Sequence, residues 1–260
     1  MKVVILCGGH GTRIRGVADD VPKPMIPIGR FPILWHIMKH YARHGHRDFV
    51  LCLGYKGQVI KDFFLNYETH VQDFTIHLGE RRQIEFHTAH AETDWRVTHA
   101  DTGLDAMTGA RLRRIQAHVS GEDDFLLTYG DGVGDIDLSA LMAFHRSHGK
   151  ILTVTGVRPP GRFGELTAGQ DGLVTAFAEK PQTTAGLISG GFFACKPQLF
   201  DYLDDRESLT FENEPMHRLV ADRQLMVFEH QGFWQPMDTQ RDYQFLNGLF
   251  ASGKAPWVTW

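Results

Sequence analysis

Short apolar runs alternate with helical patterns over the first 157 residues of the chain. Four runs are bounded by glycine or charged residues and have the β-branched and aromatic content of buried strands: 2–6, 49–53, 125–129 and 151–157. Apolar residues recur at helical spacing in the segments between them: 31–44, 57–67, 108–119 and 137–148. This alternation predicts an α/β fold, with a mainly parallel sheet covered by helices on both faces.

The pattern changes after residue 160, where glycine, proline and phenylalanine separate shorter segments. There we expect strands near 173–181 and 187–195, helices near 197–204 and 212–222, and a final helix that begins at Asp238. Residues 66–107 alternate enough to indicate extended hairpins and show no clear helix. We therefore expect a single domain over 1–260, with a core of about 1–160 and a second subregion of about 161–260 woven into it.

Composition excludes several classes of protein. With 260 residues, 42% hydrophobic and 22% charged, the chain is long enough and apolar enough for a sizeable core. A net charge of -4 argues against a general nucleic-acid surface, and no apolar run approaches the roughly 20 residues that span a membrane. The three scattered cysteines, Cys7, Cys52 and Cys195, indicate reduced thiols in a cytoplasmic protein. The fifteen histidines show no spacing typical of a zinc site.

A glycine-rich loop, "GGHGTR", follows the first predicted strand. It is neither the dinucleotide fingerprint G-x-G-x-x-G nor a Walker A loop. Its glycines allow consecutive backbone N–H groups to converge on an anion, and Arg13 and Lys23 would add charge for a polyphosphate. The alternative is a glycine turn with solvated cations. The prolines on both sides of Lys23 restrict its backbone, which favours a defined task for this lysine.

Two aspartates stand out as candidate metal ligands. Asp131 lies just past the carboxyl end of an apolar strand, the edge at which open α/β sheets bind ligands. Asp238 follows the aromatic and proline-containing segment "FWQPM". Carboxylates suit Mg²⁺, which takes one or two of them together with phosphate oxygens and water. A turn residue at Asp131 and a helix N-cap at Asp238 are the alternatives that the sequence leaves open.

Six motifs stand in order along the chain: "CGGHGTR" (7–13), "PKPM" (22–25), "YGDG" (129–132), "EKP" (179–181), "GGFF" (190–193) and "FWQPMDT" (233–239). Together they resemble the sugar-1-phosphate nucleotidyltransferase family, and the likeness to its cytidylyltransferase branch runs nearly from end to end. The resemblance implies a three-layer α/β/α, Rossmann-like nucleotidyltransferase core with a mixed, mostly parallel sheet. It also implies the reaction of CTP with a hexose 1-phosphate, in the first place glucose 1-phosphate, to give a CDP-hexose and pyrophosphate.

The resemblance assigns roles to residues that match the family's motifs. It implies four catalytic residues, Arg13, Lys23, Asp131 and Asp238, of which the two aspartates would hold Mg²⁺ as the cofactor. The implied nucleotide-binding residues are Leu6, Cys7, Gly8, Gly9, His10, Gly11, Thr12, Arg13, Lys23, Thr108, Arg111 and Gly130. The implied sugar-phosphate-binding residues are Glu179, Lys180, Ser189 and Gly190.

The partners implied are small molecules, CTP and a hexose 1-phosphate, with no nucleic acid and no membrane. Relatives are oligomeric and commonly hexameric, so we expect a homo-oligomer, with 66–107 as the subunit contact. A sugar phosphate is already anionic at neutral pH, so its oxygen can attack phosphorus without a general base. Such an enzyme must supply alignment and charge neutralisation, which Arg, Lys and Mg²⁺ provide.

Two positions depart from the family pattern and leave alternatives open. Ser189 stands where relatives commonly have asparagine, and Glu165 is unusual beside the sugar-site strand. A modified sugar phosphate, another phosphorylated acceptor, or dTTP or UTP as the nucleotide is therefore the second hypothesis. A non-catalytic regulatory subunit is the third. It is disfavoured because the proposed metal carboxylates and phosphate-binding cations are all present.

Overall fold

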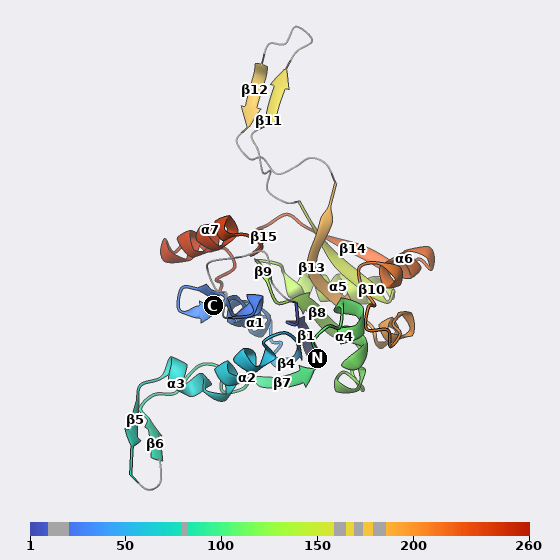
Figure 1. The fold of residues 1–260 in the computed structure, drawn as a ribbon. Coiled ribbons are helices and arrows are strands. Elements are labelled where there is room, and N and C mark those ends of the chain that lie inside the picture. The colour runs from blue at the N-terminus through green and yellow to red at the C-terminus, as the bar shows by residue number, and fades with distance from the viewer. Residues whose placement is uncertain (10–20, 80–82, 159–164, 169–173, 179–185) are drawn as a thin grey trace.

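Figure 1 shows the computed structural model, which describes residues 1–9, 21–79, 83–158, 165–168, 174–178 and 186–260. Its centre is a seven-stranded sheet, whose strands stand in the order β14 (Leu225–His230), β10 (Leu152–Val157), β13 (Ile188–Cys195), β8 (Phe125–Tyr129), β1 (Lys2–Leu6), β4 (Asp48–Leu53) and β7 (Arg96–Asp101). β13 runs antiparallel to both of its neighbours, and all other pairs are parallel. The sheet is therefore mixed and mostly parallel, as the sequence predicts.

Both faces of the sheet are covered, which gives the three predicted layers. Alternate residues of each central strand point to opposite faces. In β1, Val3 and Ile5 belong to one buried cluster, and Val4 and Leu6 belong to the other. The first face packs against α1 (Ile33–Arg43), α2 (Gly57–Leu65), α5 (Leu138–His148) and α7 (Gln240–Ala251). The second packs against α4 (Thr108–Arg114), the 3₁₀ helix η3 (Pro197–Tyr202) and α6 (Glu214–Ala221).

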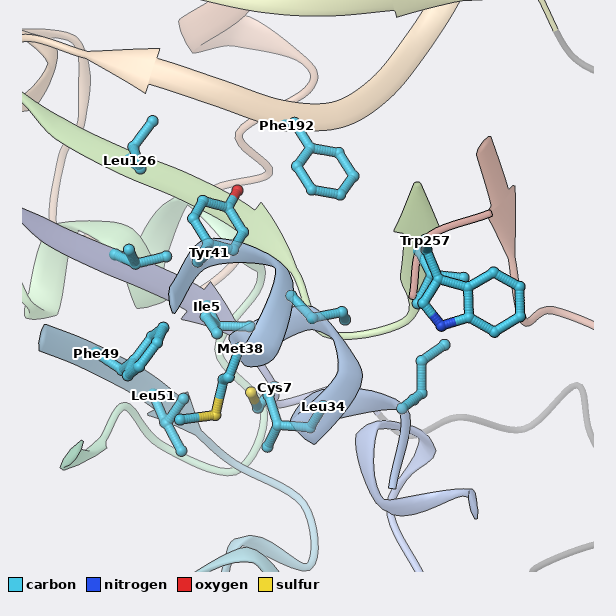
Figure 2. Packing of buried hydrophobic residues seen from close by; sticks show 14 of the residues in the cluster. Ile5, Cys7, Leu34, Met38, Tyr41, Phe49, Leu51, Leu126, Phe192 and Trp257 are labelled. Carbon is cyan, nitrogen blue, oxygen red and sulfur yellow. The ribbon is translucent and has the colours of Figure 1, made fainter. Parts of the chain in front are cut away.

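Helix α1 forms the centre of the first cluster, as Figure 2 shows. Nine of its eleven residues are buried, and Tyr41 stacks on Phe192 of β13 with ring centroids 5.9 Å apart. Trp257, near the carboxyl end of the chain, is fully buried and stacks on Phe233. The carboxyl-terminal segment is thus tied into the same core as the first strand.

Residues 66–107 differ in part from the expected hairpins. The segment contains one hairpin, β5 (Phe74–His77) with β6 (Gln83–Phe86), which projects from the body in Figure 1. It also contains a short helix, α3 (Tyr67–Val71), where no helix was predicted. Its last part, β7, is an edge strand of the main sheet, parallel to β4. The half-exposed side chains of β7 explain why its sequence lacks the apolar run of a central strand.

Other boundaries also differ from the predictions. Residues 197–202 form a 3₁₀ helix, η3, and a further strand, β14, pairs with β10 at the other edge of the sheet. Helix α7 begins at Gln240 instead of Asp238, because Thr239 is its N-cap. The remaining elements are η1 (Lys23–Met25), β2 (Pro27–Ile28), β3 (Phe31–Pro32), β9 (Gly132–Gly134), β11 (Glu165–Ala168), β12 (Val174–Ala178), β15 (Trp234–Pro236) and η2 (Gln116–His118).

The three cysteines are buried and free of disulfides, in keeping with the predicted thiols. Burial raises the pKa of the Cys7 thiol well above its ordinary value, so this side chain is a neutral part of the core and not a nucleophile. Among the helices that the structure describes, none has the length and apolar content needed to cross a membrane.

Candidate functional site

The candidate site lies along one edge of the central sheet. The parallel strands β1, β4 and β8 all end at this edge, where Gly8, Gly54 and Asp131 follow them. β13 runs the opposite way, so its beginning at Ser189 and Gly190 lies at the same edge. In open α/β sheets this edge is where ligands bind, because the strand ends leave backbone groups and loops free to contact them.

Lys23 joins the two predicted metal ligands. Its Nζ lies 2.6 Å from Asp131 Oδ2 and 2.5 Å from Asp238 Oδ1. The lysine side chain is only 15% exposed, whereas the two carboxylates are about one third exposed. The structure thus gathers three of the four predicted catalytic residues at one point. Arg13, the fourth, lies outside the described residues.

The two aspartates are held together by backbone pairing. β9 pairs with β15 in antiparallel register, with Gly132 opposite Pro236. The amide of Met237 donates a 2.8 Å hydrogen bond to the carbonyl of Asp131. The positions of Asp131 and Asp238 are therefore set by main-chain hydrogen bonds and not by the ionic contact between their side chains and Lys23.

The structure bears on the alternative role that the sequence leaves open for each aspartate. Asp131 does sit in the turn between β8 and β9, yet its carboxylate contacts Lys23. Asp238 is not the N-cap of α7: Thr239 takes that position and forms a capping box with Asp242. Asp242 also accepts a hydrogen bond from the amide of Asp238. The carboxylate of Asp238 is consequently left to face the site.

Lys23 is charged in this arrangement. Burial alone would lower its pKa, but the carboxylates of Asp131 and Asp238 outweigh that effect and raise the pKa above the ordinary value of a lysine. The flanking prolines act as the sequence predicts: Pro22 precedes η1, and the buried Pro24 follows Lys23 within it. A cation is therefore fixed between the two carboxylates.

The donor set suits a hard divalent cation that also takes ligands from a substrate. Two carboxylates reach one cation-sized position between them. Over the ranges that the structure describes, there is no group of three or more His, Cys, Asp or Glu side chains arranged to hold a metal. Two carboxylates are what Mg²⁺ commonly takes from protein when phosphate oxygens and water complete its shell.

Arg111 of α4 ties the ends of three strands together. Its side chain is 4% exposed, and its two terminal nitrogens donate to five acceptors. Those acceptors lie at or just past the ends of β1, β4 and β7: the carbonyls of Gly8, Leu53, Gly103 and Leu104, and the hydroxyl of Thr102. Burial lowers the pKa of Arg111 from its ordinary value, but an arginine keeps its charge.

The guanidinium of Arg111 also explains two glycines. A Cβ at Gly8 or at Gly54 would overlap it, so neither position has room for a side chain. The sequence predicted Arg111 as a clamp on the nucleotide. The structure places its guanidinium against Gly8, whose carbonyl accepts a 2.8 Å hydrogen bond from it. Its contact with a nucleotide remains a prediction.

The other described residues of the predicted nucleotide side lie close by. The carbonyl of Leu6 accepts a 3.0 Å hydrogen bond from the amide of Gly130, and Cys7 pairs with the backbone of β4. Gly9 is exposed at the start of the loop. His10, Gly11, Thr12 and Arg13 lie outside the described residues, as do Glu179 and Lys180 on the predicted sugar-phosphate side.

A small pocket lies beside Asp131, between β8, β13 and β15. Its lining includes the predicted residues Ser189 and Gly190, together with Tyr129 and Trp234, which sequence reasoning missed. Trp234 Nε1 donates a 2.7 Å hydrogen bond to the carbonyl of Gly190. Gly191 has φ +75°, a conformation that favours glycine, and a Cβ there would press on the ring of Tyr129. The pocket wall therefore requires the glycine pair.

Glu212 is the other residue that sequence reasoning missed. Its carboxylate accepts a hydrogen bond from the hydroxyl of Tyr129, and a second, of 2.6 Å, from Thr108. The hydroxyl of Thr108, predicted to hold the nucleotide, also accepts from the amide of Phe211. Burial and the neighbouring Glu212 raise the pKa of Tyr129, so this phenol remains protonated. No motif in the sequence marks Glu212, because its partners are distant along the chain.

Comparison with known proteins adds the family. The model of the family described as "Nucleotidyl transferase" matches residues 2–244. The chain belongs to this nucleotidyl transferase family. Its membership agrees with the site: a glycine loop at the end of β1 and paired carboxylates at the ends of β8 and β15. The predicted resemblance to nucleotidyltransferases is confirmed, and the protein is an enzyme of that class.

Curated relatives resemble this nucleotidyltransferase over its whole length. It is 51% identical over 260 residues to the glucose-1-phosphate cytidylyltransferase of Salmonella typhi and 50% identical to that of Salmonella typhimurium, in both cases over 100% of each chain. It is 42% identical to the probable glucose-1-phosphate cytidylyltransferase of Bacillus subtilis, again over 100% of each chain.

Solved structures support the fold. HddC from Yersinia pseudotuberculosis superposes with a TM-score of 0.68 at 20% identity and covers 96% of this chain and 99% of its own. A putative glucose-1-phosphate thymidylyltransferase from Bacillus anthracis gives the same TM-score at 17% identity, over 96% and 94% of the two chains. At such identities the likeness establishes the nucleotidyltransferase fold and no more.

Replacing Arg111 tests the role of its hydrogen bonds at the strand ends. We expect Arg111→Ala to lower the free energy of unfolding by about 3–5 kcal/mol, because it removes a largely buried donor from four carbonyls at once. Arg111→Lys should recover little, since one ammonium cannot reach five acceptors. Urea unfolding measures both.

Arg113→Ala, on the same helix, is the matched control for Arg111. Arg113 is 30% exposed and pairs with Asp205 at the surface, so its loss should cost less than about 1 kcal/mol. An Arg111→Ala variant as stable as Arg113→Ala would contradict the role assigned to Arg111.

Proposed function

We propose that this enzyme transfers the cytidylyl group of CTP to glucose 1-phosphate, with CDP-glucose and pyrophosphate as products. The observation that carries the proposal is the meeting of Lys23, Asp131 and Asp238 at one point, in a chain about half identical to glucose-1-phosphate cytidylyltransferases along its entire length. An intact phosphate-handling centre also argues against the regulatory alternative.

The reaction needs alignment and charge neutralisation more than acid–base chemistry. A phosphate oxygen of glucose 1-phosphate attacks the α-phosphorus of CTP, and the bond from that phosphorus to the bridging oxygen breaks, so that pyrophosphate leaves with the β and γ phosphates. The attacking oxygen is already anionic, so no proton has to be removed. Lys23 lies at the centre of the site and is charged, so we assign it to the phosphates of the nucleotide and to the departing pyrophosphate.

The carboxylates of Asp131 and Asp238 are the residues that would hold Mg²⁺. When bound, the ion neutralises phosphate charge and orients the two substrates. The carboxylates keep their mutual position through the β9–β15 pairing, so the site is preorganised for a cation. Arg111 holds the carbonyl of Gly8 at 2.8 Å, and a Cβ at Gly8 or Gly54 would overlap its guanidinium. We assign Gly8 and Gly130 to the nucleotide, because glycines allow a ligand to approach the backbone closely.

We assign the pocket lined by Ser189, Gly190, Tyr129 and Trp234 to the sugar phosphate. Trp234 and Gly191 fix its walls, and it opens beside Asp131. Ser189 is exposed and presents one hydroxyl where relatives commonly offer an amide. The roles of Arg13, Glu179 and Lys180 at the two phosphates remain predictions from the family resemblance. A cytoplasmic location, and the absence of nucleic-acid and membrane partners, also remain predictions.

We also propose that the enzyme is a homo-oligomer in which the β5–β6 hairpin contacts a second copy. The pairs Phe74–Phe86 and Ile76–Ile84 place four apolar side chains on one face of this hairpin. Phe74 and Ile76 are each 38% exposed, and Ile84 is 48% exposed. A lone two-stranded hairpin is marginally stable in water, so this one requires cover. The segments that flank this hairpin in the chain, among them α3 and β7, line an open hollow of about 550 Å³.

A substrate matrix tests the proposed reaction. Purified enzyme is incubated with each of CTP, UTP and dTTP against glucose 1-phosphate and other sugar 1-phosphates, and pyrophosphate release is measured. CTP with glucose 1-phosphate should give the highest kcat/KM. If UTP or dTTP leads, the chemistry stands but the assigned nucleotide is wrong. If glucose 1-phosphate does not react with any of the three nucleotides, the assigned acceptor is wrong, and Ser189→Asn is the first variant to try.

Neutralising either carboxylate should abolish metal-dependent turnover. We expect Asp131→Asn and Asp238→Asn each to lower kcat/KM by roughly 100-fold or more, because an amide cannot replace an anionic ligand of the metal. The fold should persist, since β9 and β15 pair through the backbone. Circular dichroism and a Mg²⁺ titration of activity check the two statements. Near-native activity in either variant would refute the metal assignment.

Charges on the apolar face of the hairpin should break the oligomer. We expect wild type to elute above its 29.5 kDa monomer mass in size-exclusion chromatography with light scattering, and Ile76→Lys to shift toward monomer. Thr75→Lys is the matched control, because Thr75 is the next residue along β5 and points to the opposite face. A monomeric wild type, or equal dissociation of both variants, would count against this contact.

A further inference from the structure

The position of Lys23 raises a question about how a metal reaches the site. In the structure, its ammonium contacts one oxygen of each carboxylate that the proposed function assigns to Mg²⁺. The inference below rests on that proposed metal site. The same two carboxylates contact a lysine in the structure and would bind a divalent cation during turnover.

The contact is built into the fold. Lys23 is confined between Pro22 and Pro24, and the backbone of η1 is closed by a 2.8 Å hydrogen bond from Met25 to the carbonyl of Pro22. Its side chain is largely buried, so the ammonium has little water to compensate for losing the carboxylates. It therefore stays on them until another anion is offered.

The carboxylates need a counter-charge at all times. β9 and β15 hold Asp131 and Asp238 close together through main-chain hydrogen bonds, whatever occupies the space between them. Two like charges at a partly buried site repel each other strongly unless a cation lies between them. Lys23 supplies that cation and leaves the trio with a single negative charge in excess.

A divalent cation does not fit beside the ammonium without cost. Added to this trio it would reverse the sign of the net charge, and it would compete with Lys23 for the same oxygens. A nucleoside triphosphate changes the balance, because its phosphates offer the ammonium new anionic partners in the same cleft. Lys23 can then leave the carboxylates as the metal takes them.

We propose that Lys23 is an exchangeable counter-cation, which occupies the metal position in the nucleotide-free enzyme and moves to the phosphates when the nucleotide arrives. The nucleotide-free enzyme consequently binds divalent metal weakly, and the metal enters together with the triphosphate. Lys23 thus acts twice: it keeps the carboxylates paired before binding, and it neutralises phosphate afterwards.

A metal titration of nucleotide-free enzyme tests the proposal. The probe is Mn²⁺, followed by isothermal titration calorimetry and by loss of the free-ion signal in electron paramagnetic resonance. Lys23→Met removes the charge but keeps a side chain of similar length. We expect it to bind one Mn²⁺ at least roughly tenfold more tightly than wild type, because the competing charge is gone. Adding Asp131→Asn to Lys23→Met should remove the gained site.

Lys39→Met is the matched control. Lys39 is also 15% exposed and pairs with a carboxylate, Glu92, at 2.7 Å, but it lies outside the site. Its replacement should leave Mn²⁺ affinity at the wild-type value. Lys23→Arg keeps the charge and should also bind Mn²⁺ weakly. Thermal unfolding with and without Mn²⁺ gives a second readout, in which Mn²⁺ should raise the midpoint of Lys23→Met more than that of wild type.

Two results would overturn the proposal. One is an unchanged or weaker Mn²⁺ affinity in folded Lys23→Met. The other needs no change at Lys23: nucleotide-free wild type that already binds Mn²⁺ as tightly as a typical two-carboxylate site, with loss of that binding in Asp131→Asn. Should Lys23→Met not fold, Lys23→Gln takes its place. None of these titrations contains CTP or a sugar phosphate, so their failure would leave the proposed reaction intact.

Discussion

The pairing of β9 with β15 is the constraint on which the site depends. Three residues of backbone pairing, with the hydrogen bond from Met237 to Asp131, place two carboxylates side by side. Neighbouring residues are arranged around the negative charge of these two carboxylates. Lys23 is held between prolines to face them, and the capping box at Thr239 starts α7 without using Asp238. The site is therefore organised by main-chain geometry, with electrostatics as its consequence.

Two buried cations serve different purposes in this architecture. Lys23 contacts carboxylates and lies among groups that a substrate can reach. Among the described residues, the hydrogen bonds of Arg111 go to neutral oxygens, chiefly carbonyls at the ends of β1, β4 and β7, and its side chain is nearly inaccessible. The first cation can change partners, because other anions compete for it. Arg111 has a structural role, because five fixed acceptors match the donor geometry of its planar guanidinium.

The sequence predicted the central layers well, because β1, β4, β8 and α1 combine strong apolar patterns with full burial. It missed β14 and misread β7, the two edge strands, since their half-exposed side chains dilute the pattern. It gathered Lys23, Asp131 and Asp238 as one site through the family resemblance and the expected strand ends. It could not place Lys23 between the two carboxylates, nor find Glu212, because such contacts arise only when distant segments fold together.

The distances along the chain have a consequence for synthesis of the protein. Lys23 is 108 residues from Asp131 and 215 from Asp238, and β13 enters the sheet between β8 and β10, which precede it in the chain. A nascent chain on the ribosome can therefore complete neither the sheet nor the carboxylate pair until its last quarter has emerged. An unfinished or carboxyl-terminally truncated copy carries the glycine loop but only half of the cation site. The order of the segments thus delays catalytic competence until translation is nearly finished.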